Sequence, residues 1–421
     1  MCGLRGAAVL LAASLGLAAA LQAQTRLEPQ ALTGLAVDDL SHLSACPDGT
    51  LFGMGHLSQP WQVRLGASQS RHPLKGYVVI RQPGSQTFGL FAGMEGEPLA
   101  LDCAAPDGEP SLFAASRDSA GVWLARVQAR TRGVVWQRPV LPAGSDVDDL
   151  TVTPAGEVYL VGHRGPEGPA VLVRVAAQTG VPVTTTELPI TGQLQELQVA
   201  LGERSVWVAG RVGVPNRPSD VFLTRLDPAV PGPGLTVTLG SPAEDVVGDL
   251  ALTGRRVCLA GSTHGTLTAG DGAGTGNAPQ GEADAFVACW TTEGQLLWVR
   301  QWGTPQADAY TRLLLREDGG VVAAGYTDGA ALPVRPPGAG GGKDALLARY
   351  SPQGTLLEAY RYGRSGDETF MALVPASPEG LVLAGRSGPG AWTVAVDAAL
   401  QVTSALPFGR LGDPSVSTPR P

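Results

Sequence analysis

The sequence predicts an all-β protein built from repeated four-stranded units. Three observations carry this prediction: a recurring apolar run that ends in a small residue, glycine turns that bound strand-like segments between these runs, and the lack of a long apolar pattern of helical period. Seven runs occur, and five of them read like Glu157 to Gly162, with mostly apolar residues and a final glycine. The seven endpoints are Gly55, Ala115, Gly162, Gly210, Gly261, Gly325 and Gly385.

The spacing of these endpoints indicates a repeat architecture. Successive endpoints lie 47 to 64 residues apart, and self-similarity at such a period is the mark of a repeat protein. In residues 284–325, strand-like segments cover 284–290, 295–302, 311–315 and 321–324, with glycine turns between them. Four antiparallel strands in a repeat of this length match one blade of a β-propeller. The sequence therefore predicts a β-propeller of seven four-stranded blades over residues 27–409.

The order of the strands predicts how the ring closes. The chain starts with an inner strand pair and finishes with an outer pair, at 392–396 and 402–408. We expect these C-terminal strands to complete the N-terminal blade, because such closure removes an exposed strand edge.

Two later repeats resemble a known family. The segments Asp344 to Gly354 and Ala323 to Asp328 resemble the bacterial beta-propeller repeat (SBBP repeat) family. The similarity extends over residues 220–410 and is faint before 160. Glu358 replaces the usual aromatic residue of the family, and Ala391-Trp392 replaces Asp-Ala in the last repeat. The resemblance implies an exported bacterial propeller and carries no common catalytic residues.

The N-terminus predicts export. Arg5 is followed by an apolar run from Ala7 to Leu21, with small residues that allow cleavage after Ala20 or Ala23. This pattern is typical of a signal peptide over residues 1–23, whereas a membrane anchor would need roughly 20 apolar residues. We expect a secreted, periplasmic or cell-envelope protein with no membrane span after cleavage. Residues 410–421, rich in proline and serine, are predicted to form a disordered tail.

Charge and cysteine content narrow the partners and the compartment. The chain has 30 Lys and Arg residues against 38 Asp and Glu residues, which argues against nucleic-acid binding and favours a soluble monomer. Four cysteines follow the signal peptide, an even number that permits disulfides outside the cytoplasm. Cys258 and Cys289 lie in consecutive predicted strands and form the candidate disulfide. A Cys46–Cys103 pair is a second option, and four buried thiols are the alternative.

Two groups of polar residues recur at fixed places in the repeats. One directly follows the endpoints: His56, Ser116, His163, Arg211, Ser262, Tyr326 and Arg386. The other opens the inner strand pairs: Asp38, Asp146, Glu196, Asp245, Asp308 and Asp367. Both groups should lie on the same end of the ring. We predict a candidate binding face for an anionic or sugar ligand, made by His56, His163, Arg211, Tyr326 and Arg386. The alternative is that these acids and bases pair with one another.

No catalytic, cofactor or metal motif stands out. The histidines are too scattered for a zinc site, and the glycine-rich stretch 269–277 lacks the ending of a phosphate-binding loop. We therefore expect a non-catalytic exported propeller, a binding or scaffold module for a surface protein or glycan, with no cofactor. The alternative is a propeller enzyme, a hydrolase or lyase, or a quinone-cofactor protein. Trp136 and Trp298, which recur in equivalent strands, motivate the quinone option.

Overall fold

The computed structural model describes residues 41–61, 64–65, 68–69, 74–82, 89–94, 96–213, 218–227, 234–269, 279–329, 342–363, 366–376, 380–387 and 390–408. The predicted signal peptide at 1–23, Asp38 and the predicted tail at 410–421 lie outside these residues. Within them every regular element is a β-strand, as the sequence predicts.

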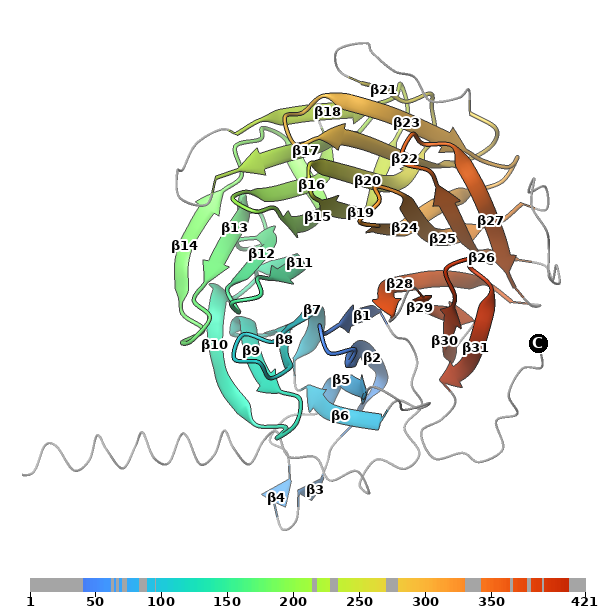
Figure 1. Ribbon diagram of the computed structural model, residues 1–421. Helices are drawn as coiled ribbons and strands as arrows, with labels where there is room; N and C mark the ends of the chain where they lie inside the picture. The colour runs from blue at the N-terminus through green and yellow to red at the C-terminus, as the bar shows by residue number, and fades with distance from the viewer. Residues whose placement is uncertain are drawn as a thin grey trace, which may run out of the picture.

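Seven antiparallel sheets stand around a common axis and form a seven-bladed β-propeller (Figure 1). This confirms the fold class and the blade number. Blade 1 consists of β1 (His42–Ala45), β2 (Leu51–Trp61), β5 (Leu74–Arg81) and β6 (Gly89–Met94). Blade 2 consists of β7 (Glu97–Ala104), β8 (Ser111–Asp118), β9 (Gly121–Gln128) and β10 (Val134–Pro142). Blade 3 consists of β11 (Asp146–Val152), β12 (Val158–His163), β13 (Ala170–Val175) and β14 (Pro182–Glu187).

The remaining four blades follow in chain order. Blade 4 consists of β15 (Gln193–Leu201), β16 (Val206–Gly213), β17 (Asp220–Leu226) and β18 (Thr236–Gly240), with the short β21 (Thr268–Ala269) on its outer edge. Blade 5 consists of β19 (Asp245–Thr253), β20 (Arg256–Thr263), β22 (Asp284–Thr291) and β23 (Leu296–Trp302). Blade 6 consists of β24 (Asp308–Leu315), β25 (Val321–Thr327), β26 (Asp344–Tyr350) and β27 (Leu356–Tyr362). Blade 7 consists of β28 (Glu368–Ala376), β29 (Gly380–Ser387), β30 (Gly390–Val396) and β31 (Val402–Phe408). A two-stranded ribbon, β3 (Arg64–Leu65) with β4 (Ser68–Gln69), lies between β2 and β5 in the chain.

The first strand of each blade is the innermost one and the last lies at the rim (Figure 1). We call the end of the ring where the innermost strands begin, and where the second strands end, the upper face. The innermost strands, β1, β7, β11, β15, β19, β24 and β28, together form the axial wall.

The predicted closure is wrong: the C-terminal strands do not complete the first blade. Strand β30 pairs with β29, with Gly385 opposite Trp392, and β31 pairs with β30. Blade 1 already has four strands of its own before residue 95. Each inner strand pair is joined to the outer pair that directly follows it, so each sequence repeat folds into one whole blade. Blades 7 and 1 meet instead through apolar side chains, with Leu51 buried in a cluster with Val374 and Val382.

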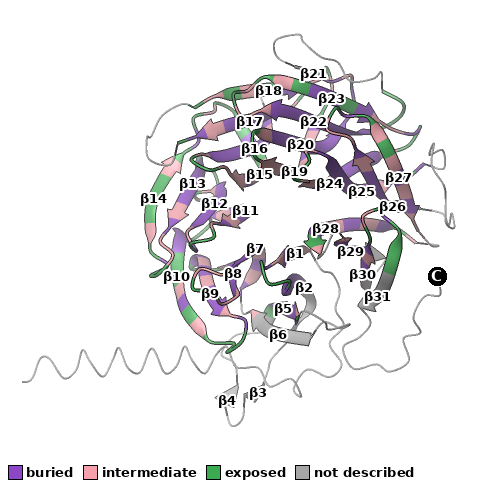
Figure 2. Cartoon of the chain, in the orientation of Figure 1, coloured by how far each residue is buried: buried purple, intermediate pink, exposed green. Residues whose placement is uncertain are grey.

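The apolar core lies between neighbouring blades. The second and third strands read as nearly continuous apolar runs because both of their faces are covered, as in β12 and β13, and Figure 2 shows this buried inner band. One cluster joins Phe113 and Val122 of blade 2 to Leu150 and Val158 of blade 3. Another joins Trp207 of blade 4 to residues of blade 5. Each blade is therefore stabilised chiefly by its neighbours.

In four blades the endpoint glycine stands opposite a β-bulge. In blade 6 the pairing of β24 with β25 shifts by one residue between Tyr310 and Arg312, and Gly325 lies opposite Tyr310. The bulge brings the backbone so close that a Cβ on Gly325 would overlap the carbonyl oxygen of Ala309. Blades 3, 5 and 7 repeat this arrangement at Gly162, Gly261 and Gly385. The repeated glycine is therefore a steric requirement of the inner hairpin.

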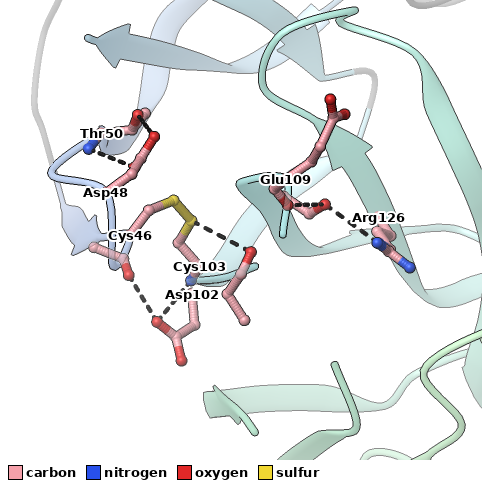
Figure 3. The surroundings of a disulfide bond; sticks show 10 residues. Cys46, Asp48, Thr50, Asp102, Cys103, Glu109 and Arg126 are labelled. Carbon is pink, nitrogen blue, oxygen red and sulfur yellow. Dashed lines mark hydrogen bonds between the residues drawn. A yellow bond between two sulfur atoms is a disulfide. The ribbon is translucent and has the colours of Figure 1, made fainter. Parts of the chain in front are cut away.

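Both sequence-predicted cysteine pairs form disulfides. Cys258 and Cys289 lie directly opposite each other in β20 and β22, with their Cα atoms 4.1 Å apart. Cys46 and Cys103 join blade 1 to blade 2 across 57 residues of chain (Figure 3). These bonds fit an oxidising, extracytoplasmic compartment. Among the described residues no helix is long and apolar enough to span a membrane.

Candidate binding face

The strand register places the two predicted polar groups at the same end of the ring, the upper face. Asp146, which opens β11, lies opposite His163, which closes β12. Likewise Gln195, next to Glu196, lies opposite Arg211, and Asp245 lies opposite Thr263, next to Ser262.

Arg211 ties blade 4 to blade 5. Its guanidinium pairs with Glu244 of blade 5 and hydrogen-bonds to Gln195 of its own blade. It also lies 3.4 Å from Glu196. Burial raises the pKa of Glu196, against the opposing effect of the Arg211 charge. The Arg211 side chain is 18% exposed, whereas Glu244 is 54% exposed, so the acid rather than the base is presented to solvent.

Arg117 makes the same kind of contact between blades 2 and 3. It lies two residues after the endpoint Ala115, whereas Arg211 lies one residue after Gly210. It pairs with Glu97 of its own blade at 2.7 Å and with Asp146 of blade 3 at 2.7 Å. The hydrogen bond from Arg117 lowers the pKa of Glu97, and the charges of His56 and Lys75 lower it further. His56 of blade 1 therefore faces an acid of blade 2.

His163 ties blade 3 to blade 4. Its Nε2 lies 2.9 Å from the main-chain oxygen of Leu194, and its Nδ1 lies 3.5 Å from Asp148 Oδ2. The nearby Asp148 carboxylate raises the pKa of His163, and partial burial opposes this rise.

The other predicted face residues differ in their surroundings. Tyr326 closes β25 and carries Lys343 Nζ 4.3 Å above its ring, a cation–π contact. Arg386 lies in β29 opposite Thr369, and its side chain is outside the described part of the structure. The structure thus brings His163 and Arg211 into one run of inter-blade contacts, while Tyr326 lies in blade 6, outside this run.

Two of the predicted acids, Asp245 and Asp308, are fully buried and act as local hydrogen-bond acceptors. Asp245 accepts hydrogen bonds from Ser241 and Thr263, and Asp308 accepts them from the main chain and hydroxyl of Thr304. The Asp308 main-chain NH also donates to Ala283 O of the preceding blade at 2.7 Å. Asp367 is exposed and accepts a hydrogen bond from Lys343 N. These contacts favour the interpretation in which the polar groups stabilise the ring.

Three further carboxylates were missed by sequence reasoning, and all lie in the axial wall. We call Asp102, Asp149 and Asp249 the axial carboxylates. Each accepts a hydrogen bond from the main-chain NH of the next residue and a second one from the innermost strand of the following blade. The second donors are Val152 N at 3.0 Å, Val199 N at 2.9 Å and Leu313 N at 2.7 Å. Ser44 of blade 1 also donates to Asp102, beside the Cys46–Cys103 bond (Figure 3).

The depth of the axial carboxylates perturbs their ionisation. Burial raises the pKa of Asp149 to about 8, and the charges of Asp249 and Asp102 raise it further, against two main-chain hydrogen bonds. Burial raises the pKa of Asp249 to about 6, and the Arg312 charge opposes this rise. The pKa of Asp102 is raised by burial too. All three residues are half-buried rather than sealed, so solvent reaches the wall.

A sequence signal for the axial carboxylates exists in retrospect. Asp102 and Asp149 precede their endpoints by thirteen residues, and Asp249 precedes Gly261 by twelve. The described part of the chain contains no group of three or more His, Cys, Asp or Glu side chains arranged to hold a metal ion.

Comparison with known proteins gives the fold alone. No protein-family model matches the chain, and no curated protein sequence matches it. A dihydro-heme d1 dehydrogenase, NirN, superimposes with a TM-score of 0.51 at 12% identity, over 91% of this chain and 75% of that chain. A puromycin hydrolase superimposes with a TM-score of 0.52 at 15% identity, over 94% of this chain and 56% of that chain. The chain is therefore a β-propeller similar in fold to enzymes of unrelated chemistry.

Proposed function

We propose that this protein is an exported, non-catalytic β-propeller that binds or scaffolds a surface protein or a glycan through its upper face. The two disulfides support an extracytoplasmic location. The resemblance of residues 220–410 to SBBP repeats supports a bacterial exported protein. We further propose that it acts as a monomer.

One observation carries the proposal: the upper face presents carboxylates held in fixed positions. Asp146 and Glu244 are 47% and 54% exposed, and each is held by a more buried arginine that also fixes the neighbouring blade. Because the arginines are already paired, the face offers acceptors more than cations. Fixed carboxylates can accept hydrogen bonds from sugar hydroxyls or pair with basic side chains of a protein. The rigid ring lowers the entropic cost of ordering them on binding.

A binding screen tests this proposal. Residues 24–421 would be assayed against a glycan array, cell-wall fragments and extracts of surface proteins. We expect one class to bind, and Glu244→Gln or Asp146→Asn to weaken binding by roughly 10- to 100-fold, as for loss of a charged hydrogen bond. Glu293→Gln is the matched control, because Glu293 is an exposed acid in the β22–β23 turn on the opposite face. No binding to any class, or equal loss in the control, would contradict the proposal.

A propeller hydrolase is the second candidate, because Asp149 and Asp249 of the axial wall have pKa values of about 8 and about 6. Carboxyl groups with separated pKa values can serve as an acid and a base. Both oxygens of each group already accept main-chain hydrogen bonds, which favours a structural role. Turnover in a hydrolase substrate panel that is abolished by Asp149→Asn would replace the binding proposal.

The quinone-cofactor alternative loses the observation that motivated it. Trp136 and Trp298 lie in the rim strands β10 and β23, where their indole NH groups donate to Ala177 O and Pro352 O of the next blade. Their recurrence is explained by this contact between blades. The absorption spectrum of the purified protein remains the direct test for a bound quinone.

A further inference from the structure

Three basic side chains at the upper face connect successive blades, and only one of them titrates near neutral pH. Arg117, His163 and Arg211 each face an acid of their own blade and also reach the next blade. Arginine is a permanent cation, so the contacts from blade 2 to 3 and from blade 4 to 5 do not change with pH. The contact from blade 3 to 4 depends on whether His163 carries one proton or two.

The hydrogen-bond partners fix the tautomer of the neutral ring. A main-chain oxygen only accepts hydrogen bonds, so the Nε2 atom that lies 2.9 Å from Leu194 O must carry hydrogen. In the neutral ring, Nδ1 is then an unprotonated acceptor, and it faces Asp148 Oδ2 at 3.5 Å. This oxygen is buried and has no hydrogen-bond partner among the described residues. Two acceptors therefore face each other until Nδ1 takes up a proton.

We propose that protonation of His163 strengthens the link between blades 3 and 4 by adding a second hydrogen bond. The imidazolium donates to Leu194 O of blade 4 and to Asp148 of blade 3 at once, whereas the neutral ring keeps only the Leu194 bond. The inference concerns the stability of the propeller itself and does not depend on any ligand.

The surroundings favour the cation. Strand β11 presents Asp146 and Asp148 to the ring, and β15 adds Glu196, whose charge acts on Asp148. Arg117 of β8 neutralises Asp146, and Arg211 of β16 neutralises Glu196, while β13 places only Ala170 opposite His163. Among the described residues, Asp148 is therefore the acid of this group that has no cation other than His163. The pKa of His163 is raised by this contact, so the stabilisation is complete below the unfolded value and is lost as the pH rises through the folded value.

Histidine NMR provides a direct test. The chain has five histidines, and the C2–H resonance of His163 is assigned by its loss in His163→Gln. We expect the pKa of His163 in the folded protein to lie above its value in the urea-unfolded protein, and Asp148→Asn to lower the folded value. A folded-state His163 pKa at or below the unfolded value in the wild-type protein would overturn the proposal.

Thermal unfolding supplies the second readout. We expect the wild-type Tm to fall more between pH 5.5 and pH 8 than the Tm of His163→Gln, with His264→Gln behaving as wild type. His163→Arg installs the permanent cation of the neighbouring ties and should reduce the pH dependence while keeping the higher Tm at pH 8. Equal pH dependence in wild type and His163→Gln would overturn the proposal. If His163→Gln does not fold, the loss of the C2–H resonance in His163→Arg assigns it, and the Asp148→Asn titration decides alone.

Discussion

At the scale of single residues, the recurring glycines are explained by sterics rather than flexibility. Gly325 and its equivalents sit where a bulge of the innermost strand brings a main-chain oxygen against the Cα atom. Any side chain at such a site must displace the innermost strand. Because that strand carries the axial carboxylates Asp149 and Asp249 in blades 3 and 5, the glycine of those blades indirectly fixes this part of the axial wall.

Gly325→Ala should therefore destabilise the protein by about 1–3 kcal/mol, the usual cost of overpacking. Gly213→Ala is the control, since a Cβ there would meet its nearest atom, Gln193 O, at an ordinary 3.6 Å. Urea denaturation followed by tryptophan fluorescence measures both. Equal stability of the two variants would contradict the steric explanation.

Asp149 should make the stability of the protein depend on pH. Its pKa is 3.8 in the reference state and about 8 in the folded protein, so the folded protein holds one more proton between these values. Stability should then fall as the pH rises through this window, by up to about 1.4 kcal/mol per unit. Asp149→Asn removes this titration. The free energy of unfolding, measured by urea denaturation at each pH, should then change less between pH 5 and pH 8. An unchanged slope would show that Asp149 ionises normally.

The predicted site shows what a single sequence reveals at this scale. The position of His163 and Arg211 directly after the endpoints predicted correctly at which end of the propeller they lie. Their partners did not, because Glu244 and Leu194 come from the next blade, and a pattern within one repeat carries no information on contacts between repeats. The axial carboxylates were missed for a related reason: their second hydrogen bond also crosses to the next blade.

At the scale of elements, the rim strands are joined to the next blade by aromatic residues. Trp298 of β23 lies against Gly354, in the β26–β27 turn of blade 6, where the positive φ of 78° and the missing side chain make room for the indole. Trp136 lies in the same way against Gly180 of blade 3. In blade 6, Tyr362 of β27 donates to Leu400 O in the β30–β31 turn of blade 7. A contact between a rim strand and a turn of the next blade thus recurs at three places. Trp packs on glycine in two of them, and Tyr makes the contact in the third.

Trp298→Ala should cost about 3–5 kcal/mol, because a large buried side chain is lost, and Trp298→Phe only about 1 kcal/mol for the hydrogen bond. Chemical denaturation of the two variants measures the difference. A loss below 1 kcal/mol in Trp298→Ala would show that the rim contact contributes little.

Strands and turns were predictable from the sequence because alternation, apolar runs and glycine turns are local. The register shifts were not. The rim strand bulges at Val135, Val183, Leu297 and Leu357, four exposed apolar residues. A bulge bends the outer edge away from flat pairing with another sheet, so these residues fit the protection of edge strands. Each bulge corresponds to a single extra residue in the rim strand, and no local sequence pattern predicts where that residue falls.

At the scale of the whole molecule, the ring closes without exchanging strands. Blade 1 is held to blade 2 by the Cys46–Cys103 bond and by Ser44, and to the rest of the ring by apolar packing against blade 7. Arg312 of blade 6 also reaches Ser41 O, at 3.5 Å. The first blade therefore depends on the covalent bond more than the internal blades do.

Cys46→Ser with Cys103→Ser should lower stability by about 2–4 kcal/mol. It should also make blade 1 exchange its amide hydrogens faster than blades 3 to 6. Cys258→Ser with Cys289→Ser is the control, since that bond joins two strands of one blade that are already paired. Hydrogen-exchange mass spectrometry resolves the blades. Uniform loosening in both double variants would contradict a special role for the first bond.

Deleting residues 391–421 should cause aggregation. The deletion removes β31 and all but the first residue of β30, and it would expose the edge of β29 with Leu383, which is fully buried. An exposed apolar strand edge favours association. Removing only residues 410–421 should leave the association state of the protein unchanged. Size-exclusion chromatography distinguishes these outcomes, and a soluble monomer with an unchanged Tm after the longer deletion would contradict this account of blade 7.

Closure without strand exchange also bears on how such a ring changes over generations. When the last strands complete the first blade, the two ends of the gene must evolve together. Here one repeat of the coding sequence equals one complete blade, so a duplication adds a whole blade without altering either end. Asp344 and Gly363 of blade 6 follow Asp284 and Gly303 of blade 5 by 60 residues each, the offset that copying of a single blade leaves behind.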